Sequence, residues 1–151
     1  MASVACLLDA PFDPGEELRR FAAGHGNAGG VVSFLGQVRA AADGDDPVLA
    51  LELSEFPPLT LPGIRALLDQ AQKRWSLTGL LALHRVGVLE PGDPIVFVAA
   101  AARHRRDAFA AADFVMDHLK SDAWLWKRER TASGWRWVEP RPQDHADRAR
   151  W

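Results

Sequence analysis

Two lysines in the C-terminal half of the chain have the type and spacing needed for proton transfer or anion binding. Lys120 falls at the end of a predicted helix at 106–120, and Lys127 lies in the strand predicted to follow it. The residues between them can fold back and bring the two amines together. Paired amines lower each other's pKa, so one can act as a base or nucleophile while its charged neighbour holds an anion. The alternative is a helix-end lysine that complements the helix dipole and an exposed strand lysine.

A second basic cluster lies at the start of the same predicted helix, where the helix dipole disfavours positive charge. It consists of Arg103, His104, Arg105 and Arg106. His104 and Arg105 can bind phosphate, the arginine through its planar fork and the histidine as a switchable donor. The alternative is a solvated basic helix start. His104 lies about 24 Å from Lys120 along a continuous helix, so one chain alone would struggle to bring them together.

Other motifs narrow the choice of chemistry. Arg39 is predicted at a strand-to-loop junction, where it can reach an anionic ligand or be an ordinary strand-end arginine. The histidines show no metal-binding pattern, and Cys6 is the single cysteine, so no metal site and no cofactor are expected. The glycines at 24–30 lack the spacing of a phosphate loop. The residues therefore favour a local anion site.

Composition indicates one domain over residues 1–151, with a polar C-terminal arm at about 139–151. The formal net charge of −2 argues against a broad nucleic-acid surface. Four tryptophans, at 124, 126, 135 and 137, are expected to pack a sheet face or an interface, although stacking on single-stranded nucleic acid is the alternative. The N-terminus shows no targeting segment and no stretch is long enough to span a membrane. A cytoplasmic protein is expected.

Hydrophobic periodicity and turn residues predict three helices and a set of strands. Asp13 and Pro14 are typical of a helix start, and a second helix is predicted at 60–75. The helix at 106–120 is predicted to bury a stripe at Phe109, Ala112, Met116 and Leu119. Strands are predicted at 31–38, 48–53, 80–88 and 95–101, the last two forming a hairpin, and a C-terminal hairpin joins 124–130 to 135–138.

Six short strings, taken in order over about residues 28–141, resemble the catalytic large subunit of molybdopterin synthase. Each string is weak alone, and their shared order and spacing make the resemblance specific. They are FLGQVR (34–39), HRVG (84–87), PGD (91–93), HRRDAF (104–109), MDHLK (116–120) and WKRE (126–129).

This resemblance implies an α/β (α+β) hammerhead-type fold with a mainly antiparallel sheet. It implies a homodimer within a heterotetramer, in which each large subunit binds a small ubiquitin-like sulfur-carrier subunit. The C-terminal Gly-Gly thiocarboxylate of the carrier would deliver sulfur to cyclic pyranopterin monophosphate. Two such transfers would form the dithiolene of molybdopterin. A non-catalytic anion-binding adaptor that docks an acidic partner is the alternative function.

The resemblance also assigns roles to individual residues. Lys120 and Lys127 match the two active-site lysines of the family, with Lys120 as the expected catalytic amine. Lys127 and Arg39 would hold phosphate or the carboxyl group of the carrier. Preorganised cations suit this chemistry, because sulfur attack opens the cyclic phosphate and shifts negative charge.

Further residues are expected to complete the pocket. His104, Arg105 and Arg141 would bind substrate from the neighbouring subunit. The chain departs from the family pattern at Trp124 and at 54–56, and it adds a charge at Arg103. These departures remove none of the expected catalytic residues. The remaining pocket-lining residues implied by the resemblance are Gln37, Val38, Arg128 and Glu129.

Overall fold

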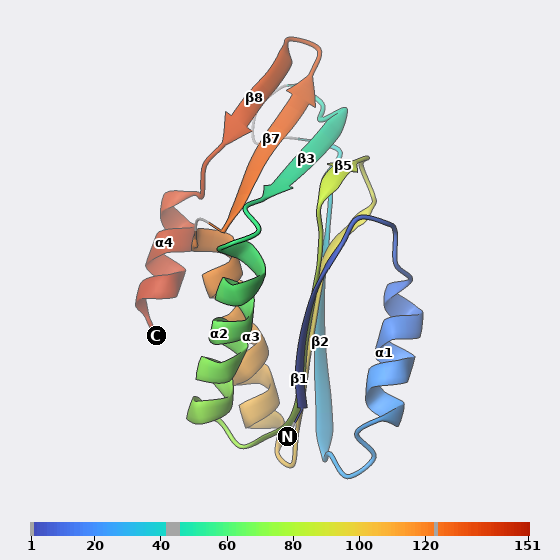
Figure 1. Cartoon of the computed structure of the whole chain (residues 1–151), viewed down its shortest axis with the longest axis vertical. Coiled ribbons are helices and arrows are strands. Elements are labelled where there is room, and N and C mark those ends of the chain that lie inside the picture. Colours follow the sequence, from blue (N-terminus) through green and yellow to red (C-terminus); the bar gives the residue numbers. More distant parts are fainter. Residues whose placement is uncertain (1, 42–45, 123) are drawn as a thin grey trace.

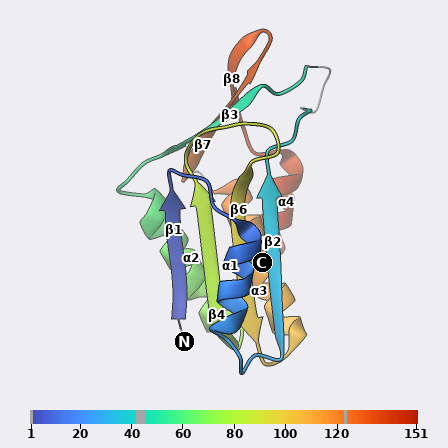
Figure 2. The same cartoon turned by 90° about the vertical axis from the view of Figure 1, so that its right-hand side faces the viewer.

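The computed structural model describes residues 2–41, 46–122 and 124–151. It contains two four-stranded sheets, with strand orders β1-β4-β6-β2 and β5-β3-β7-β8. The small sheet extends beyond one end of the main sheet (Figure 1, Figure 2). The strands are β1 (Ala2–Leu8), β2 (Gly30–Gln37), β3 (Ala50–Glu55), β4 (Leu77–Arg85), β5 (Gly87–Leu89), β6 (Pro94–Ala102), β7 (Leu125–Thr131) and β8 (Gly134–Val138).

Helices cover both faces of the main sheet. Helices α2 (Thr60–Arg74) and α3 (Arg105–Ser121) lie on one face, and α1 (Pro14–Ala23) lies on the other (Figure 1). The fourth helix, α4 (Pro142–Ala149), packs on α3 and falls in the segment that was expected to be an arm. The α+β class is confirmed, and every strand pair except the parallel β1–β4 pair is antiparallel within the described residues. Among those residues, no helix has the length and apolar character needed to cross a membrane.

Strand β6 shows why the main sheet is buried on both faces. Its side chains alternate between two apolar cores, as the two-residue period of a strand requires. Val96, Val98 and Ala100 pack into the core beneath α2 and α3. Phe97 and Ala99 pack into the core beneath α1.

The start of α1 follows the sequence prediction. Asp13 caps the helix by accepting a hydrogen bond from the Glu16 backbone N–H at 3.1 Å, and Pro14 occupies the first turn. The prediction for α2 is confirmed as well, because Ile64, Leu67 and other residues of its apolar face are buried. The β7–β8 hairpin is confirmed by its antiparallel register.

The strand predicted at 80–88 is two strands that belong to different sheets. β4 pairs with β6 in the main sheet, whereas β5 pairs with β3 in the small sheet. Gly87 has a φ of +96° at the point where the chain turns from one sheet to the other. Apolar residues on both sides of this glycine made the segment read as one strand, because a change of sheet leaves the alternation intact.

The predicted buried stripe of α3 is wrong at one position. Phe109 is 61% exposed, whereas its neighbour Ala108 is fully buried. Alanines at 108, 111 and 112 let the helix approach the sheet closely, so the buried arc is centred on them. Phe109 follows Ala108 by about 100° around the helix axis and therefore points along the side of the sheet.

We expect Gly87→Ala to lower the free energy of unfolding by about 1–2 kcal/mol, because a Cβ is disfavoured in the left-handed region. A Cβ at residue 87 would meet no atom within 4 Å, so the loss of stability would come from backbone strain and not from a steric clash. Gly26→Ala is the matched control, since its Cβ also meets nothing and its φ is not positive. Urea unfolding should show a change below about 0.5 kcal/mol for the control. Equal losses in the two variants would contradict the role of Gly87.

Candidate functional site

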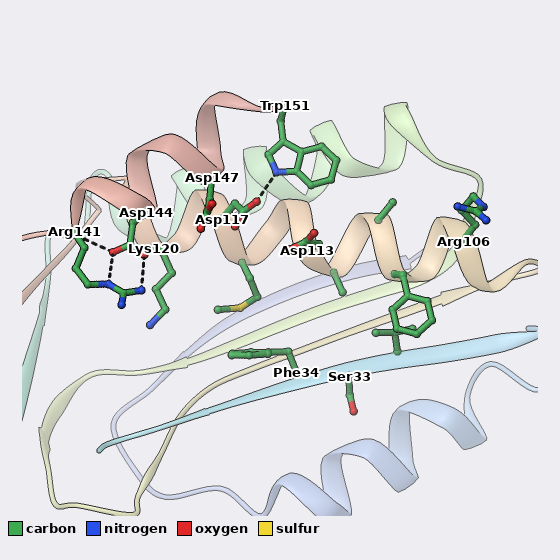
Figure 3. A pocket seen from close by; sticks show the side chains of 15 residues that line it. Ser33, Phe34, Arg106, Asp113, Asp117, Lys120, Arg141, Asp144, Asp147 and Trp151 are labelled. Carbon is green, nitrogen blue, oxygen red and sulfur yellow. Dashed lines mark hydrogen bonds and ion pairs between the residues drawn. The ribbon is translucent and has the colours of Figure 1, made fainter. Parts of the chain in front are cut away.

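A groove of about 680 Å³ runs between β2, α3 and α4. Lys120, Arg141 and Asp144 lie at one end of it, and Arg106 lies at the other (Figure 3). Apolar side chains, among them Phe34 from β2 and Phe109 from α3, line part of it, and Asp113 and Asp117 of α3 lie between its two ends (Figure 3). The groove therefore combines charged and apolar side chains.

Lys127 is the more strongly perturbed of the two lysines. It lies on β7 opposite Leu53 of β3 and Val138 of β8, so strands flank it on both sides. Burial lowers the pKa of its amine to about 8, and the positive charge of Lys120 adds to the effect. The chain reversal between α3 and β7 thus brings the two amines into electrostatic range, as the spacing predicted.

Lys120 lies in the last turn of α3 and keeps access to solvent. Protein atoms around the amine still desolvate it, which lowers its pKa, and the charges of Arg141 and Arg39 act in the same direction. The carboxylate of Asp144 opposes them and raises the pKa. Four expected site residues, Arg39, Lys120, Lys127 and Arg141, are therefore brought together.

These four cations come from four different elements. Arg39 follows β2, Lys120 ends α3, Lys127 lies on β7 and Arg141 is the N-cap of α4. Arg141 was expected to act from a neighbouring subunit, but it lies beside Lys120 of its own chain.

The end of β2 is held by the turn between β5 and β6. The Val38 backbone N–H donates to the Asp93 carbonyl at 3.0 Å, and the Gly92 N–H donates to the Val38 carbonyl at 2.8 Å. The Val38 side chain is buried in the core of the small sheet and so anchors the backbone next to Arg39. Gln37 is exposed at the last position of β2.

The strand alternation of β7 separates two residues that were expected to share the pocket. Glu129 follows Lys127 by two positions and shares its face of the sheet, and its charge raises the pKa of Lys127. Arg128 points to the opposite face. There its guanidinium donates to both carboxylate oxygens of Glu52, at 2.8 and 3.0 Å, and stacks on Trp135.

His104 and Arg105 lie at the far end of α3 from Lys120. They are the N-cap and the first residue of the helix, and both are exposed. The length of α3 separates them from the lysines by about 24 Å. Within one chain the structure does not bring them to the site.

Two site residues were missed by the sequence analysis. Asp144 follows the N-cap of α4 by three residues, and the order Arg-Pro-x-Asp is itself a helix-start signal that could have revealed it. The second is His84, which falls in the strand predicted at 80–88 and is buried at the end of β4. Nothing in a strand pattern indicates that such a residue lies near two lysines.

His84 is a neutral residue beside the lysine pair. Its Nδ1 donates a hydrogen bond to the Arg85 carbonyl at 2.8 Å, since a carbonyl oxygen can only accept. Burial lowers the pKa of His84 to about 4, against the opposing effect of that hydrogen bond, and the charges of Lys127 and Lys120 lower it further. The ring adds no positive charge at neutral pH.

Acidic and histidine side chains do not form a metal site in the part of the chain that the structure describes. No group of three or more such side chains is close enough to hold an ion. The chemistry that the arrangement can perform is thus anion binding and charge stabilisation by cations.

Comparisons with known proteins agree with one another. The sequence model of the family described as "MoaE protein" matches residues 7–122. The molybdopterin synthase catalytic subunit of Pseudomonas aeruginosa is 47% identical over 145 residues, which cover 96% of each chain. That of Ralstonia nicotianae is 46% identical over 145 residues, covering 96% of this chain and 82% of the relative.

Solved structures show the same fold. The molybdopterin biosynthesis MoaE protein of Burkholderia ambifaria superimposes with a TM-score of 0.81 at 39% identity, over all of this chain and 98% of that one. A complex of subunits 1 and 2 of the Helicobacter pylori molybdopterin-converting factor gives a TM-score of 0.76 at 17% identity, over 91% of each chain. At that identity the second likeness concerns the fold alone.

The burial of His84 predicts a pH-dependent stability. The unfolded chain takes up a proton at this residue below about pH 6.5, whereas the folded chain resists protonation until about pH 4. Stability should therefore fall as the pH drops through this window, by about 2 kcal/mol between pH 7 and pH 5. Urea unfolding of the wild type and His84→Gln at both pH values measures it. Parallel losses in the two proteins would contradict the assignment.

Proposed function

The chain belongs to the MoaE family, and we propose that it acts as a molybdopterin synthase catalytic subunit whose reaction centre is the cation cluster around Lys120 and Lys127. The resemblance inferred from the six sequence strings is confirmed by the family match and by relatives of 46–47% identity. The enzyme transfers sulfur from the thiocarboxylated C-terminus of a small ubiquitin-like carrier to cyclic pyranopterin monophosphate. Two transfers form the dithiolene of molybdopterin.

The observation that carries this proposal is the convergence of four cations around Lys120, two of which, Lys120 and Arg141, line one end of the groove. Both the carrier C-terminus and the cyclic phosphate are anionic. Opening of the cyclic phosphate moves negative charge onto a phosphate oxygen, and preorganised cations stabilise that charge without having to reorganise. The same cations can receive the carboxylate that remains on the carrier after sulfur has left.

The two lysines differ in how they can serve this reaction. Lys120 lines the groove and keeps solvent access, so a bound substrate can reach its amine. We assign it the contact with the reacting group. Lys127 lies deeper, between β3 and β8, and the charge of Lys120 acts on its amine. Its amine holds phosphate or the carrier carboxylate while it is protonated.

A homodimer explains the placing of His104 and Arg105. These residues lie too far from Lys120 to act on the same site within one chain. Two aromatic side chains of the groove, Phe34 and Phe109, are 41% and 61% exposed in the single chain. Strand β2 is the last strand of the main sheet, so its outer edge is open within the described residues. A second copy that covers these aromatic side chains would bring its own His104 and Arg105 towards the lysines.

The proposed assembly is a heterotetramer of two catalytic subunits and two carriers. The relatives of Pseudomonas aeruginosa and Ralstonia nicotianae are named as catalytic subunits of molybdopterin synthase, which is consistent with a further subunit as the partner here. The pocket-lining roles of Gln37, Glu129 and Arg141 remain part of this proposal. A cytoplasmic location stays a prediction.

Replacement of Lys120 tests the catalytic role directly. In a reconstitution with thiocarboxylated carrier and cyclic precursor, we expect Lys120→Ala to reduce dithiolene formation by about 10²–10³-fold, the typical loss of one charge-stabilising group. Product is measured by mass spectrometry, and carrier binding by gel filtration should persist. Lys73→Ala, at a lysine on α2 outside the groove, is the matched control. Normal turnover of Lys120→Ala, or loss of carrier binding instead of turnover, would favour a non-catalytic adaptor.

Lys127 predicts how precursor binding depends on pH. Its ammonium form binds the anion, and with a pKa of about 8 that form is lost as the pH rises. We expect the affinity for the cyclic precursor, a phosphodiester of constant charge in this range, to fall by about tenfold between pH 7 and pH 9.

Two substitutions at this position separate the charge from its titration. Lys127→Arg should keep the affinity at pH 9, because a guanidinium remains charged there. Lys127→Met should bind weakly at both pH values. Calorimetry measures all three proteins, and a wild-type affinity that is constant from pH 7 to pH 9 would refute the anion-holding role.

A further inference from the structure

Asp144 is the carboxylate of the groove whose charge raises the pKa of Lys120. It lies in the first turn of α4. The Arg141 backbone N–H donates to Asp144 Oδ2 at 2.8 Å, and the Arg141 guanidinium approaches Asp144 Oδ1 at 3.3 Å. The Asp144 side chain is 12% exposed. Figure 3 shows Arg141, Asp144 and Lys120 side by side at the same end of the groove. The Asp144 carboxylate is therefore held by Arg141 at the end of the groove that Lys120 lines, where its charge acts on the Lys120 amine.

Contacts at the other end of α4 hold this helix against α3. The Arg150 guanidinium donates to Asp113 at 2.7 Å and to Asp117 at 2.8 Å, and Trp151 Nε1 donates to Asp117 at 2.6 Å. Asp113 and Asp117 precede Lys120 on the same helix. α4 is thus tied to the element that carries the lysine it faces.

An aromatic contact reinforces the docking of α4. The Trp151 ring packs edge-on against Trp75 and Phe114, each at a centroid distance of 5.6 Å. Arg148 also pairs with Asp122, one residue beyond the end of α3, at 2.9 Å. These contacts at the C-terminal end of α4 hold the helix that carries Asp144 against the helix that carries Lys120.

The groups around Lys120 are mostly positive. Arg39 faces it from the end of β2, Lys127 from β7 and Arg141 from α4, while His84 of β4 is neutral.

The other carboxylates nearby have partners of their own. On α3, Asp117 also lines the groove, but its carboxylate accepts hydrogen bonds from Arg150 and Trp151. On α4, Asp147 accepts a hydrogen bond from Gln143 at 2.7 Å. Glu129 on β7 pairs with Arg136 at 3.2 Å.

We propose that Asp144 is a positioning residue of the sulfur transfer: its carboxylate keeps the Lys120 amine charged and directed into the groove among the surrounding cations. This inference rests on the proposed function, because it concerns how Lys120 stays competent for that reaction. Asp144 acts through Lys120 and contacts no reacting atom. Its negative charge offsets the repulsion that the neighbouring cations exert on the ammonium ion.

The expected consequence is a change in the protonation of Lys120. Burial and the neighbouring cations lower its pKa, and Asp144 raises it. Without the carboxylate, the amine should lose its proton at a lower pH. The alkaline side of the activity profile should then move to lower pH as well, while the acidic side stays in place.

Lysine NMR tests this without any turnover. The chain has three lysines, at 73, 120 and 127, so reductive ¹³C-methylation gives few signals, which single Lys→Arg variants assign. Asp144→Asn removes the charge but keeps an oxygen that can accept from the Arg141 N–H. We expect the titration midpoint of Lys120 to fall by about 0.5–1 pH unit. The Lys73 signal is the internal reference.

A matched control and a second variant keep the test decisive. Asp147→Asn removes a charge from the same helix and the same groove, and it should leave the Lys120 midpoint within about 0.2 pH unit because its carboxylate does not act on that amine. Asp144→Ser gives the same readout should the Asn variant not fold. An unchanged midpoint in the Asp144 variants, or equal shifts at 144 and 147, would overturn the proposal.

Activity supplies the second measurement. The kcat of Asp144→Asn should fall at a lower pH than that of the wild type, the KM for the carrier should stay the same, and Asp144→Glu should restore part of the profile. A variant impaired equally at every pH would indicate a merely structural role and would count against the proposal. A wild type that forms no dithiolene at any pH would defeat the proposed function, whereas the NMR titration would still decide the role of Asp144.

Discussion

Repulsion between like charges is the constraint on which this site depends. Four cations lie close together beside one end of the groove, and, in addition to burial, positive neighbours lower the pKa of Lys120 and Lys127. Burial is the largest cause of the lowered pKa of both lysines and acts more strongly on Lys127, while the Asp144 carboxylate raises the pKa of both. In the folded protein the two lysine amines therefore have different pKa values, although the side chains are identical. A neutral His84 beneath them avoids a further positive charge.

The two-sheet architecture makes this gathering possible. Lys120 ends a helix that covers the main sheet, and Lys127 lies on a strand of the small sheet. The chain passes between the sheets at Gly87, where a positive φ allows the abrupt change of direction. Helix α4 then returns across α3, and its N-cap brings Arg141 and Asp144 to the same place. The four cations therefore come from separate parts of the chain: the residues after β2, the last turn of α3, β7 and the N-cap of α4.

Local physics explains which structural predictions were right. The capped start of α1, the apolar face of α2 and the β7–β8 hairpin depend on residues that are neighbours along the chain. Phe109 was wrongly predicted to be buried, because the side of a helix that packs on a sheet depends on the contact between the two. The small alanines at 108, 111 and 112 form that contact in α3, and Phe109 lies outside it. The split at Gly87 was missed because two strands in different sheets can carry one continuous apolar pattern.

The sequence by itself determined the family, because the order of short strings can be read without coordinates, and the spacing of Lys120 and Lys127 predicted that their amines lie near each other. It also determined that His104 and Lys120 cannot meet in one chain, because the rise of a helix sets their separation. Only the tertiary structure decided that Arg128 pairs with Glu52, that Arg141 lies beside Lys120 of its own chain and that Asp144 accompanies them. Those facts follow from strand facing and helix docking, which are set by packing between residues distant in the chain.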